Sequence, residues 1–207
     1  MKRKKYNVRF KREGKKDEII QAAVQLFIEK GFDRVSLSDI ASRLNLGRTT
    51  IYEYFNNKSE ILALYLEKEI LDYHEKVMSI MNKKVAFRNK LMEFIKLQLE
   101  YGGYHKSFSQ LFRSLSRSSG NISAKTEAAI RGKHQEIYVA LMNEFNAAIR
   151  RKEIRDLPSD VLMQLLINAT SFSLRGKKEP AQIAEEVFSI FWSGISNINL
   201  KERKIND

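Results

Sequence analysis

Apolar residues recur at helical spacing in the first part of the chain. Intervals of three and four residues place them on one side of a helix. This pattern predicts a first helix over about 16–30, which Gly31 ends as a C-cap. Ser36 can cap a second, short helix over 37–44. After a break, a third short helix is expected over 48–55, so three helices joined by tight turns open the chain.

The same spacing continues through the rest of the chain. Asn57 and Glu60 stand as an N-cap and a third-position acid, so a long fourth helix is expected from there to Met81. Further helices are expected at about 85–101, 105–117, 124–152, 159–175 and 179–197. Only 2 prolines and 9 glycines interrupt stretches that are rich in helix-forming residues. We therefore expect an all-α fold, and the lack of an internal repeat disfavours a solenoid.

The charge of the chain indicates what kind of partner it binds. The formal net charge is +12 and the pI is about 9.8, which indicates an anionic partner such as nucleic acid or an acidic membrane surface. Residues 1–16 hold nine Lys or Arg against one acid. Such a run is often only a solvated arm, but its closeness to the first helices also fits DNA contact. Tyr6, Val8 and Phe10 alternate instead of lining one helical face, which disfavours a membrane-binding helix.

Other classes of function find little support in the sequence. The chain has no cysteine, and Asp17 and Glu18 follow its basic start in place of an apolar signal segment, so we expect a cytoplasmic protein. Its three histidines are too widely spaced to share one helical face, and no catalytic or phosphate-loop motif is present. We therefore expect no metal, no cofactor and no enzymatic activity.

The third helix has the pattern of a DNA-reading helix. Ile51 and Phe55 fall on one apolar side, and Thr49 and Glu53 lie at the centre of the opposite side. Two tyrosines flank this polar side and suit contacts with phosphates. Two short helices joined by a tight turn form the helix-turn-helix geometry that fits a DNA major groove.

Between 16 and 62 the chain carries Asp39-Ile40-Ala41, Leu44, Leu46, Thr50-Ile51-Tyr52-Glu53-Tyr54-Phe55 and Lys58-Ser59-Glu60-Ile61-Leu62. In this order and spacing these residues resemble the tetracycline-repressor (TetR) family. The resemblance implies a three-helix DNA-binding head, a fourth connecting helix, and a helical body that forms a homodimer and usually binds a small-molecule inducer. The domains expected on this basis are a basic flexible arm at 1–15, a DNA-binding domain at 16–62, and a ligand-binding and dimerisation domain at 63–207.

The resemblance also assigns residues to DNA. The expected contacts are Ser36, Arg48, Thr49, Thr50, Tyr52, Glu53, Tyr54 and Lys58. Arg48, Thr49 and Thr50 should approach base edges or nearby phosphates, whereas the tyrosines and Lys58 should bind phosphates. Three positions depart from the common pattern of the family. Gly47 stands where a Ser or Thr cap is usual, Thr49 stands where a small residue is frequent, and Glu53 stands where a neutral or basic residue is common. Glu53 could accept from cytosine, pair with Arg48 or repel phosphate.

Aromatic residues are frequent in the helices expected over 85–152. They are most simply core residues, but the family resemblance implies an effector cavity among these helices, which would be apolar with few polar groups. The expected ligand-binding residues are Tyr101, Phe108, Phe112, Arg113, Tyr138 and Phe145. Arg113 could hold an anionic group of the ligand, or it could be an exposed surface charge.

The last two expected helices carry apolar residues on more than one side, as in a bundle that a second copy completes. The expected dimer-interface residues are Leu162, Leu165, Leu166, Val187, Phe191 and Ile195. A two-fold dimer would place two heads at successive major grooves, about 34 to 36 Å apart on a palindromic operator. We expect a repressor that a small-molecule effector releases from double-stranded DNA. The alternatives are an activator, a ligand-aided repressor, a nonspecific nucleoid-type protein and a helical enzyme.

Overall fold

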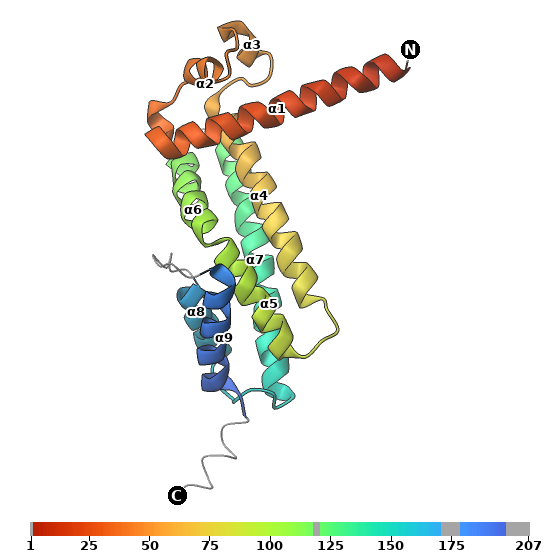
Figure 1. Ribbon diagram of the computed structural model, residues 1–207, viewed down its shortest axis with the longest axis vertical. Helices are drawn as coiled ribbons and strands as arrows, with labels where there is room; N and C mark the ends of the chain where they lie inside the picture. Colours follow the sequence, from red (N-terminus) through yellow and green to blue (C-terminus); the bar gives the residue numbers. More distant parts are fainter. Residues whose placement is uncertain (1, 118–120, 171–178, 198–207) are drawn as a thin grey trace, which may run out of the picture. The chain divides into compact units, whose positions relative to one another are not determined.

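The fold is built from α-helices, which confirms the expected fold class. The structure is a computed structural model that describes residues 2–117, 121–170 and 179–197. Its elements are α1 (Lys2–Lys30), the 3-10 helix η1 (Phe32–Arg34), α2 (Leu37–Arg43), α3 (Arg48–Tyr52), α4 (Lys58–Met81), α5 (Phe87–Glu100), α6 (Gly102–Arg117), α7 (Asn121–Arg150), α8 (Ser159–Thr170) and α9 (Pro180–Ile195) (Figure 1). Within the described ranges, β pairing is limited to one isolated bridge between Ile154 and Ser196.

Several helix boundaries differ from the prediction, the start of α1 by the most residues. α1 begins at Lys2 and not near residue 16, so the segment expected as a separate arm continues the helix. No proline interrupts this segment, and Lys and Arg have high helix propensity. α3 ends at Tyr52, although the Phe55 N–H still donates to the Ile51 carbonyl (3.0 Å). Residues 171–175 of the eighth expected helix lie outside the described residues.

The chain divides into two compact units. The first, the head unit, contains Met1–Ile70 and Ser107–Arg131, and the second, the body unit, contains Leu71–Lys106 and Gly132–Asp207. α4, α6 and α7 each contribute residues to both units. This division by contacts places residues 107–131 with the head, so it does not follow the expected functional boundary after residue 62, which stays a prediction.

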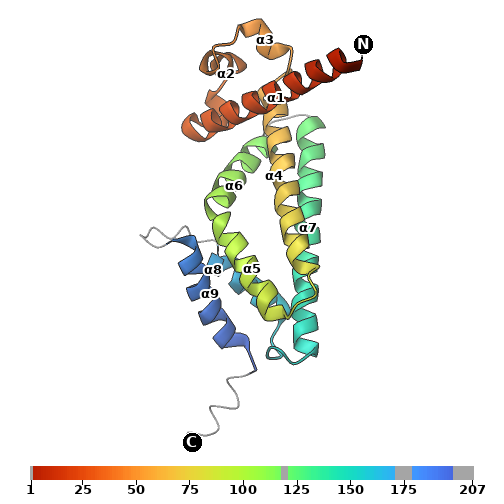
Figure 2. The same ribbon diagram turned by 45° about the vertical axis from the view of Figure 1, so that its right-hand side comes forward.

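The core of the head unit draws on every helix near the N-terminus. Its most deeply buried residues include Ile19, Ala23, Phe27, Ile40, Ile51, Phe55, Ile61 and Leu62. Gly31 ends α1 with a φ of 86°, a conformation that favours glycine, and its N–H donates to the Phe27 carbonyl (3.0 Å). The predicted C-cap is confirmed. Figures 1 and 2 both show α2 and α3 together on one side of α1.

In the body unit, α5 packs against α9 and α8 (Figure 2). Phe87 of α5 meets Phe145 edge-on, with ring centroids 5.1 Å apart, and Phe188 and Trp192 of α9 stack on each other. The guanidinium of Arg88 lies over the Phe188 ring, 5.0 Å from its centroid. Aromatic rings therefore form much of the contact between α5 and its neighbours.

The chain after α7 is tied to the end of α9. The Arg155 N–H donates to the Ile195 carbonyl (2.7 Å). The Asn197 side-chain amide donates to the carbonyls of Lys152 (2.8 Å) and Ile154 (2.9 Å). We call these residues, 152–155 with 195–197, the C-terminal clasp. It holds the last turn of α9 against a segment about 40 residues earlier in the sequence.

Candidate nucleic-acid interface

A reciprocal cap holds the start of α2. The Ser36 hydroxyl oxygen accepts the Asp39 N–H (3.2 Å), and the Asp39 carboxylate accepts the Ser36 hydroxyl (2.6 Å) and the Ser36 N–H (2.8 Å). These hydrogen bonds, from the hydroxyl first and then the backbone, hold the pKa of Asp39 below its usual 3.8. Ser36 is exposed, so any contact with DNA would be added to this capping role.

A tight turn separates α2 from α3. Asn45 has a φ of 52°, a left-handed conformation that asparagine adopts more readily than most residues. The Leu46 N–H donates to the Ala41 carbonyl (2.8 Å) across this turn. The predicted break after Leu44 is therefore confirmed, and the two short helices form a helix-turn-helix.

α3 presents an apolar side to the core and a polar side to solvent. Ile51 is fully buried and Phe55 is 1% exposed. Of the expected DNA contacts on this segment, Arg48, Thr49, Tyr52 and Glu53 are exposed, and Thr50 and Tyr54 are half-buried. Tyr52 keeps 58% of its surface accessible although it is a large aromatic residue. The polar side is thus available to a partner, as the apolar spacing predicts.

Gly47 is the N-cap of α3 and offers no side-chain hydrogen bond to the helix. Its φ of −62° and ψ of 146° are open to any residue. A Cβ at this position would lie 3.6 Å from the Thr50 hydroxyl oxygen, an ordinary contact distance. The backbone therefore does not require glycine here, and nothing in the structure explains the departure from Ser or Thr.

Lys58 begins α4 and ties it to η1. Its Nζ donates to the carbonyls of Phe32 (2.8 Å) and Asp33 (3.0 Å) and lies 4.6 Å from the centroid of the Phe32 ring. The expected cap of α4 is also present, because Asn57 Oδ1 accepts the Glu60 N–H (2.9 Å). Sequence reasoning missed this tie, since its acceptors are backbone carbonyls 25 and 26 residues away. An ammonium has three N–H donors, so a phosphate can be added to the two carbonyls.

The expected ligand-binding residues fall into both units. Phe108, Phe112 and Arg113 belong to the head unit, and Tyr101, Tyr138 and Phe145 to the body unit. Phe108 is buried and stacks on Phe112, with centroids 6.2 Å apart, whereas Arg113 is exposed. Phe145 is fully buried and Tyr138 is 40% exposed. Phe145 is therefore a core residue of the body unit.

Tyr101 is held by side chains of α4. Its hydroxyl donates to Asp72 (2.6 Å) and also accepts from Lys76, whose Nζ donates to Asp72 (2.7 Å) as well. Partial burial, followed by the bond to the Asp72 carboxylate, raises the pKa of the Tyr101 hydroxyl. The ring of Tyr101 lies against Tyr73, with centroids 5.4 Å apart. This network anchors the end of α5 on α4.

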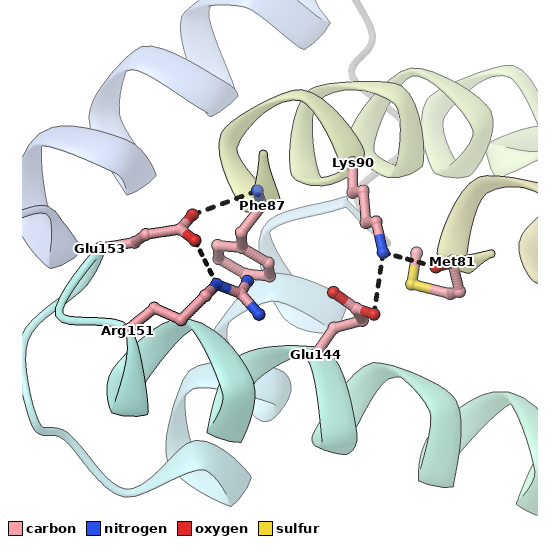
Figure 3. Close-up of polar contacts among 6 residues, drawn as sticks. All are labelled: Met81, Phe87, Lys90, Glu144, Arg151 and Glu153. Carbon is pink, nitrogen blue, oxygen red and sulfur yellow. Dashed lines mark hydrogen bonds and ion pairs between the residues drawn. The ribbon is translucent and has the colours of Figure 1, made fainter. Parts of the chain in front are cut away.

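Two further sets of polar contacts in the body unit connect α5 to other segments (Figure 3). The Lys90 side chain, 9% exposed, donates to the Met81 carbonyl (2.5 Å) and to Glu144 (2.8 Å). Glu153 accepts the Phe87 N–H (3.2 Å) at the start of α5 and also pairs with Arg151. Breaking a buried pair leaves an uncompensated charge, so Lys90 and Glu144 fix the packing of α5 on α7.

A surface hollow of about 520 Å³ also lies in the body unit. Its lining residues are Asn146, Ile149, Arg150, Asp156, Leu157, Pro158 and Ser159. None of the six expected ligand-binding residues is among them. The sequence pattern could not find this hollow, because its lining combines the end of α7 with the loop that follows.

The expected dimer-interface residues differ in burial. Leu162, Leu166 and Ile195 are buried within the subunit, at 3%, 0% and 4% exposure, so they cannot meet a second copy without rearrangement. Leu165 is 54% exposed, and Val187 and Phe191 are half-buried. Val161 and Ile190, which the prediction omitted, are 49% and 75% exposed. The same helices thus carry two apolar sides, one for the subunit core and one facing outward.

Two other kinds of site find no support in the described part of the chain. No helix there is long and apolar enough to cross a membrane. Nor do the described His, Asp and Glu side chains form a group of three that could hold a metal ion. The polar side of α3 remains the strongest candidate for function.

Comparisons with known proteins find similar transcriptional regulators. Residues 19–65 match the family described as bacterial regulatory proteins, tetR family. The biofilm operon icaADBC HTH-type negative transcriptional regulator IcaR of Staphylococcus aureus strain Newman is 27% identical over 201 residues, covering 90% of this chain and 100% of that protein. The ketosteroid transcriptional regulator KstR2 of Mycobacterium tuberculosis has a TM-score of 0.74 at 18% identity, covering 88% of this chain and 95% of that one. AibR, solved with isovaleryl coenzyme A and operator DNA, has a TM-score of 0.68 at 17% identity, covering 84% and 96%.

The helix-turn-helix and the helical body define a DNA-binding transcriptional regulator. The chain belongs to the TetR family of transcriptional regulators. This family is not enzymatic, so the expectation that the chain is no enzyme is confirmed at the level of the family.

Proposed function

We propose that this chain is a homodimeric repressor that holds a palindromic operator through α3 and leaves it when a small-molecule effector binds. The observation that carries the proposal is the exposed polar side of α3 above a fully buried Ile51. Base reading needs a helix held in a fixed position. The Ser36 cap on α2 and the Lys58 tie on α4 support α3 from both sides in sequence.

Roles at DNA follow from exposure and chemistry. Arg48 and Thr49 are exposed at the first turn of α3, and we assign them to base edges. Thr50, Tyr52 and Tyr54 are assigned to phosphates or, for Thr50, to a neighbouring base edge. Ser36 and Lys58 add phosphate contacts to their structural roles. Glu53 is exposed on the same side, where it selects against a close phosphate or accepts from a cytosine.

Repression is favoured over activation by one relative. IcaR of Staphylococcus aureus, which is similar to this chain over almost all of its length, is a negative transcriptional regulator. A regulator of this kind acts on the chromosome, which supports the cytoplasmic location expected from the sequence. We assign the DNA-binding role to 16–62 and the ligand-binding and dimerisation role to 63–207.

The dimer is supported by the outward side of the last two helices. Leu165 and Ile190 expose more than half of their surface, and Val161 lies one helical turn from Leu165. Exposed apolar residues gathered on two adjacent helices are typical of a surface that another subunit covers. We therefore assign Val161, Leu165, Val187, Ile190 and Phe191 to the interface, and leave Leu162, Leu166 and Ile195 to the core.

Effector release is supported by the fold. AibR shares it and binds both operator DNA and isovaleryl coenzyme A. α4 is a continuous helix that contributes to the head unit and to the body unit. A ligand that favours one position of α4 would change the fit of two heads to adjacent grooves, and this linkage would lower operator affinity.

Selection of bound fragments from bacterial genomic DNA tests the proposal. We expect a palindromic consensus with half-sites about one helical turn apart. Arg48→Ala and Thr49→Ala should change which bases are preferred. Each lost base contact should remove about 1 to 3 kcal/mol of discrimination against the wrong base. An unchanged consensus in both variants would contradict base reading by α3, and selection without any consensus would favour a nonspecific DNA-binding protein.

A further inference from the structure

We propose that the N-terminal part of α1 is a second DNA-binding element, a basic helix that lies along the phosphates beside the segment held by α3. The inference deepens the proposed function and rests on it, because the head must bring the duplex to this helix. It gives a role to the charge excess of residues 1–16, which the helix-turn-helix does not use.

The basic residues are sorted by helical register. At about 100° per residue, all but one of the Lys and Arg in 2–16 occupy positions within an arc of about 180°. These positions, which we call the basic side of α1, are Lys2, Lys4, Lys5, Arg9, Lys11, Arg12, Lys15 and Lys16. The opposite half holds Arg3 together with Glu13, Asp17 and Glu18. A charged tail that works without structure gains nothing from such sorting, so the pattern indicates a function for the helix.

The basic side is in register with the side of α1 that packs in the head. Ile19, Ala23 and Phe27 share that side and are fully buried. Lys16, at the end of the basic side, has its Nζ 5.3 Å from the centroid of the Phe55 ring, just after α3. Both views show α1 continuing past α2 and α3 toward its N-terminus (Figures 1 and 2). The basic side therefore extends from the packed part of α1 along the same helix, in a register that the buried residues set.

The dimensions suit a duplex. Residues 2–16 of α1 span about 22 Å, which corresponds to about six base pairs of DNA at 3.4 Å each. Lys and Arg that neutralise phosphates release counterions and add affinity without reading sequence. Because residues 2–16 and the packed part of α1 form one continuous helix, the second contact is intramolecular once α3 is bound. The result is a longer footprint and a steeper salt dependence.

A membrane surface fits the same helix less well. A membrane-binding helix needs a continuous apolar face opposite its charges. The half opposite the basic side has Tyr6 and Phe10, but it also carries three carboxylates and Arg3. Such a face would bury charged groups in the lipid, so we assign the basic side to DNA.

The test measures binding of the full-length protein to a 30-base-pair duplex of random sequence across a salt series, by fluorescence anisotropy. The triple variant Lys5→Gln, Arg9→Gln and Arg12→Gln should lower the slope of log affinity against log salt by about 2 to 3 and weaken binding more than about tenfold near 0.1 M salt. An unchanged slope would overturn the proposal.

Single variants separate a sorted helix from a simple charged tail. Arg9→Gln and Arg3→Gln remove the same charge, from the basic side and from the opposite half. We expect a loss of about fivefold for Arg9→Gln and less than about twofold for Arg3→Gln. Equal losses would show that only total charge matters, and would overturn the role of the register.

Gly14 allows the helix to be broken without a change of charge. A Cβ there meets nothing within 4 Å, so Gly14→Ala should preserve α1 and its DNA binding. Gly14→Pro interrupts the helix before residue 14 but is compatible with a helix that begins there, so the head keeps Lys15–Lys30. We expect the proline variant to lower the slope of log affinity against log salt by about 2 to 3, as the triple variant does, with an unchanged unfolding temperature. Wild-type binding in the proline variant would overturn the proposal.

Two further outcomes distinguish DNA binding by α1 from membrane binding and from the proposed repressor function. Tighter binding to phosphatidylserine vesicles than to the duplex, lost in the triple variant, would overturn it in favour of a membrane. Genomic selection could return no consensus while the triple variant still lowers the slope of log affinity against log salt. In that case the proposed repressor function fails, and the basic side of α1 stands as a DNA contact.

Discussion

Lys58 has two kinds of neighbour, one within the protein and one expected on DNA. Its ammonium bonds to the Phe32 and Asp33 carbonyls hold the start of α4 against η1. Charge-assisted bonds to backbone carbonyls are among the stronger ones in proteins, particularly where they are partly buried. Substitution of this lysine should therefore disturb the head even before DNA is added.

Substitution of Lys58 should affect both stability and DNA binding, whereas substitution of Tyr52 should affect DNA binding alone. Lys58→Ala should lower the free energy of unfolding by about 1 to 2 kcal/mol and also weaken binding to all DNA sequences. Tyr52→Phe removes only an exposed hydroxyl, so it should weaken DNA binding with stability unchanged to within about 0.5 kcal/mol. Denaturant unfolding and salt-dependent binding measure both quantities. Lys68→Ala on the same helix, where the lysine is exposed in its pair with Asp17, is the control and should leave stability unaltered.

Substitution of glycine by alanine should have opposite effects on protein stability at Gly31 and at Gly132. Gly31 has a φ of 86°, so Gly31→Ala should cost about 1 to 2 kcal/mol of stability. Gly132 lies inside α7, and a Cβ there meets nothing within 4 Å, so Gly132→Ala should add about 0.5 to 1 kcal/mol. Thermal and urea unfolding measure the difference. A loss of stability in both variants would mean that Gly132 has a role that its surroundings do not reveal.

At the scale of elements, apolar spacing predicts the helices well and their outer limits poorly. Ile51 and Phe55 define the buried side of α3, and Asn57 with Glu60 define the start of α4, because both signals are local. The start of α1 is different, since lysine and arginine are compatible with both a helix and a solvated arm. The Lys58 tie and the Lys90 network could not be predicted, because each joins segments that only the fold brings together.

The cap of α2 should make the head sensitive to acid. The pKa of Asp39 is lowered in the folded protein, so its carboxylate form stabilises α2 above about pH 4, the range of an unperturbed aspartate. This contribution is lost as the pH falls through the lowered pKa. We expect Asp39→Asn to be less stable than wild type near pH 7 and equally stable at strongly acidic pH, measured by denaturant unfolding at each pH.

A double-variant comparison tests the cause. Ser36→Ala removes the hydroxyl bonds of the cap, so adding Asp39→Asn to it should have a smaller effect than Asp39→Asn alone. Additive effects of the two substitutions would show that Asp39 acts through a group other than the Ser36 hydroxyl, such as the Ser36 N–H.

At the scale of the whole molecule, the apolar pattern of α8 and α9 cannot say which side meets the subunit core. Leu162 and Leu165 are three residues apart and both fit a buried position by sequence, yet one is 3% and the other 54% exposed. Only the placement of α5 against α8 and α9 decides between them. The interface on α8 and α9 therefore stays a proposal, and three of its expected residues, Leu162, Leu166 and Ile195, are buried in the subunit.

The proposed dimer makes a direct prediction. Leu165→Glu and Ile190→Glu should each yield monomers, because a charge in a desolvated contact is repeated by two-fold symmetry. Binding to a palindromic site should fall far more than binding to a half-site, since the second head is lost. Val139→Glu alters a 45% exposed apolar residue on α7 and should remain dimeric. Light scattering reports the mass, and dimers in both interface variants would exclude α8 and α9 as the contact.

The C-terminal clasp turns a single backbone amide into a reporter of assembly. The Arg155 N–H is bonded to the Ile195 carbonyl, so it can exchange with deuterium only when the last turn of α9 lifts away. If α9 forms part of the dimer interface, dimerisation also opposes the lifting of its last turn. Exchange at Arg155 should then slow as protein concentration rises, and should lose this dependence in Ile190→Glu. In a chain that stays monomeric, the same amide would exchange at one rate whatever the concentration.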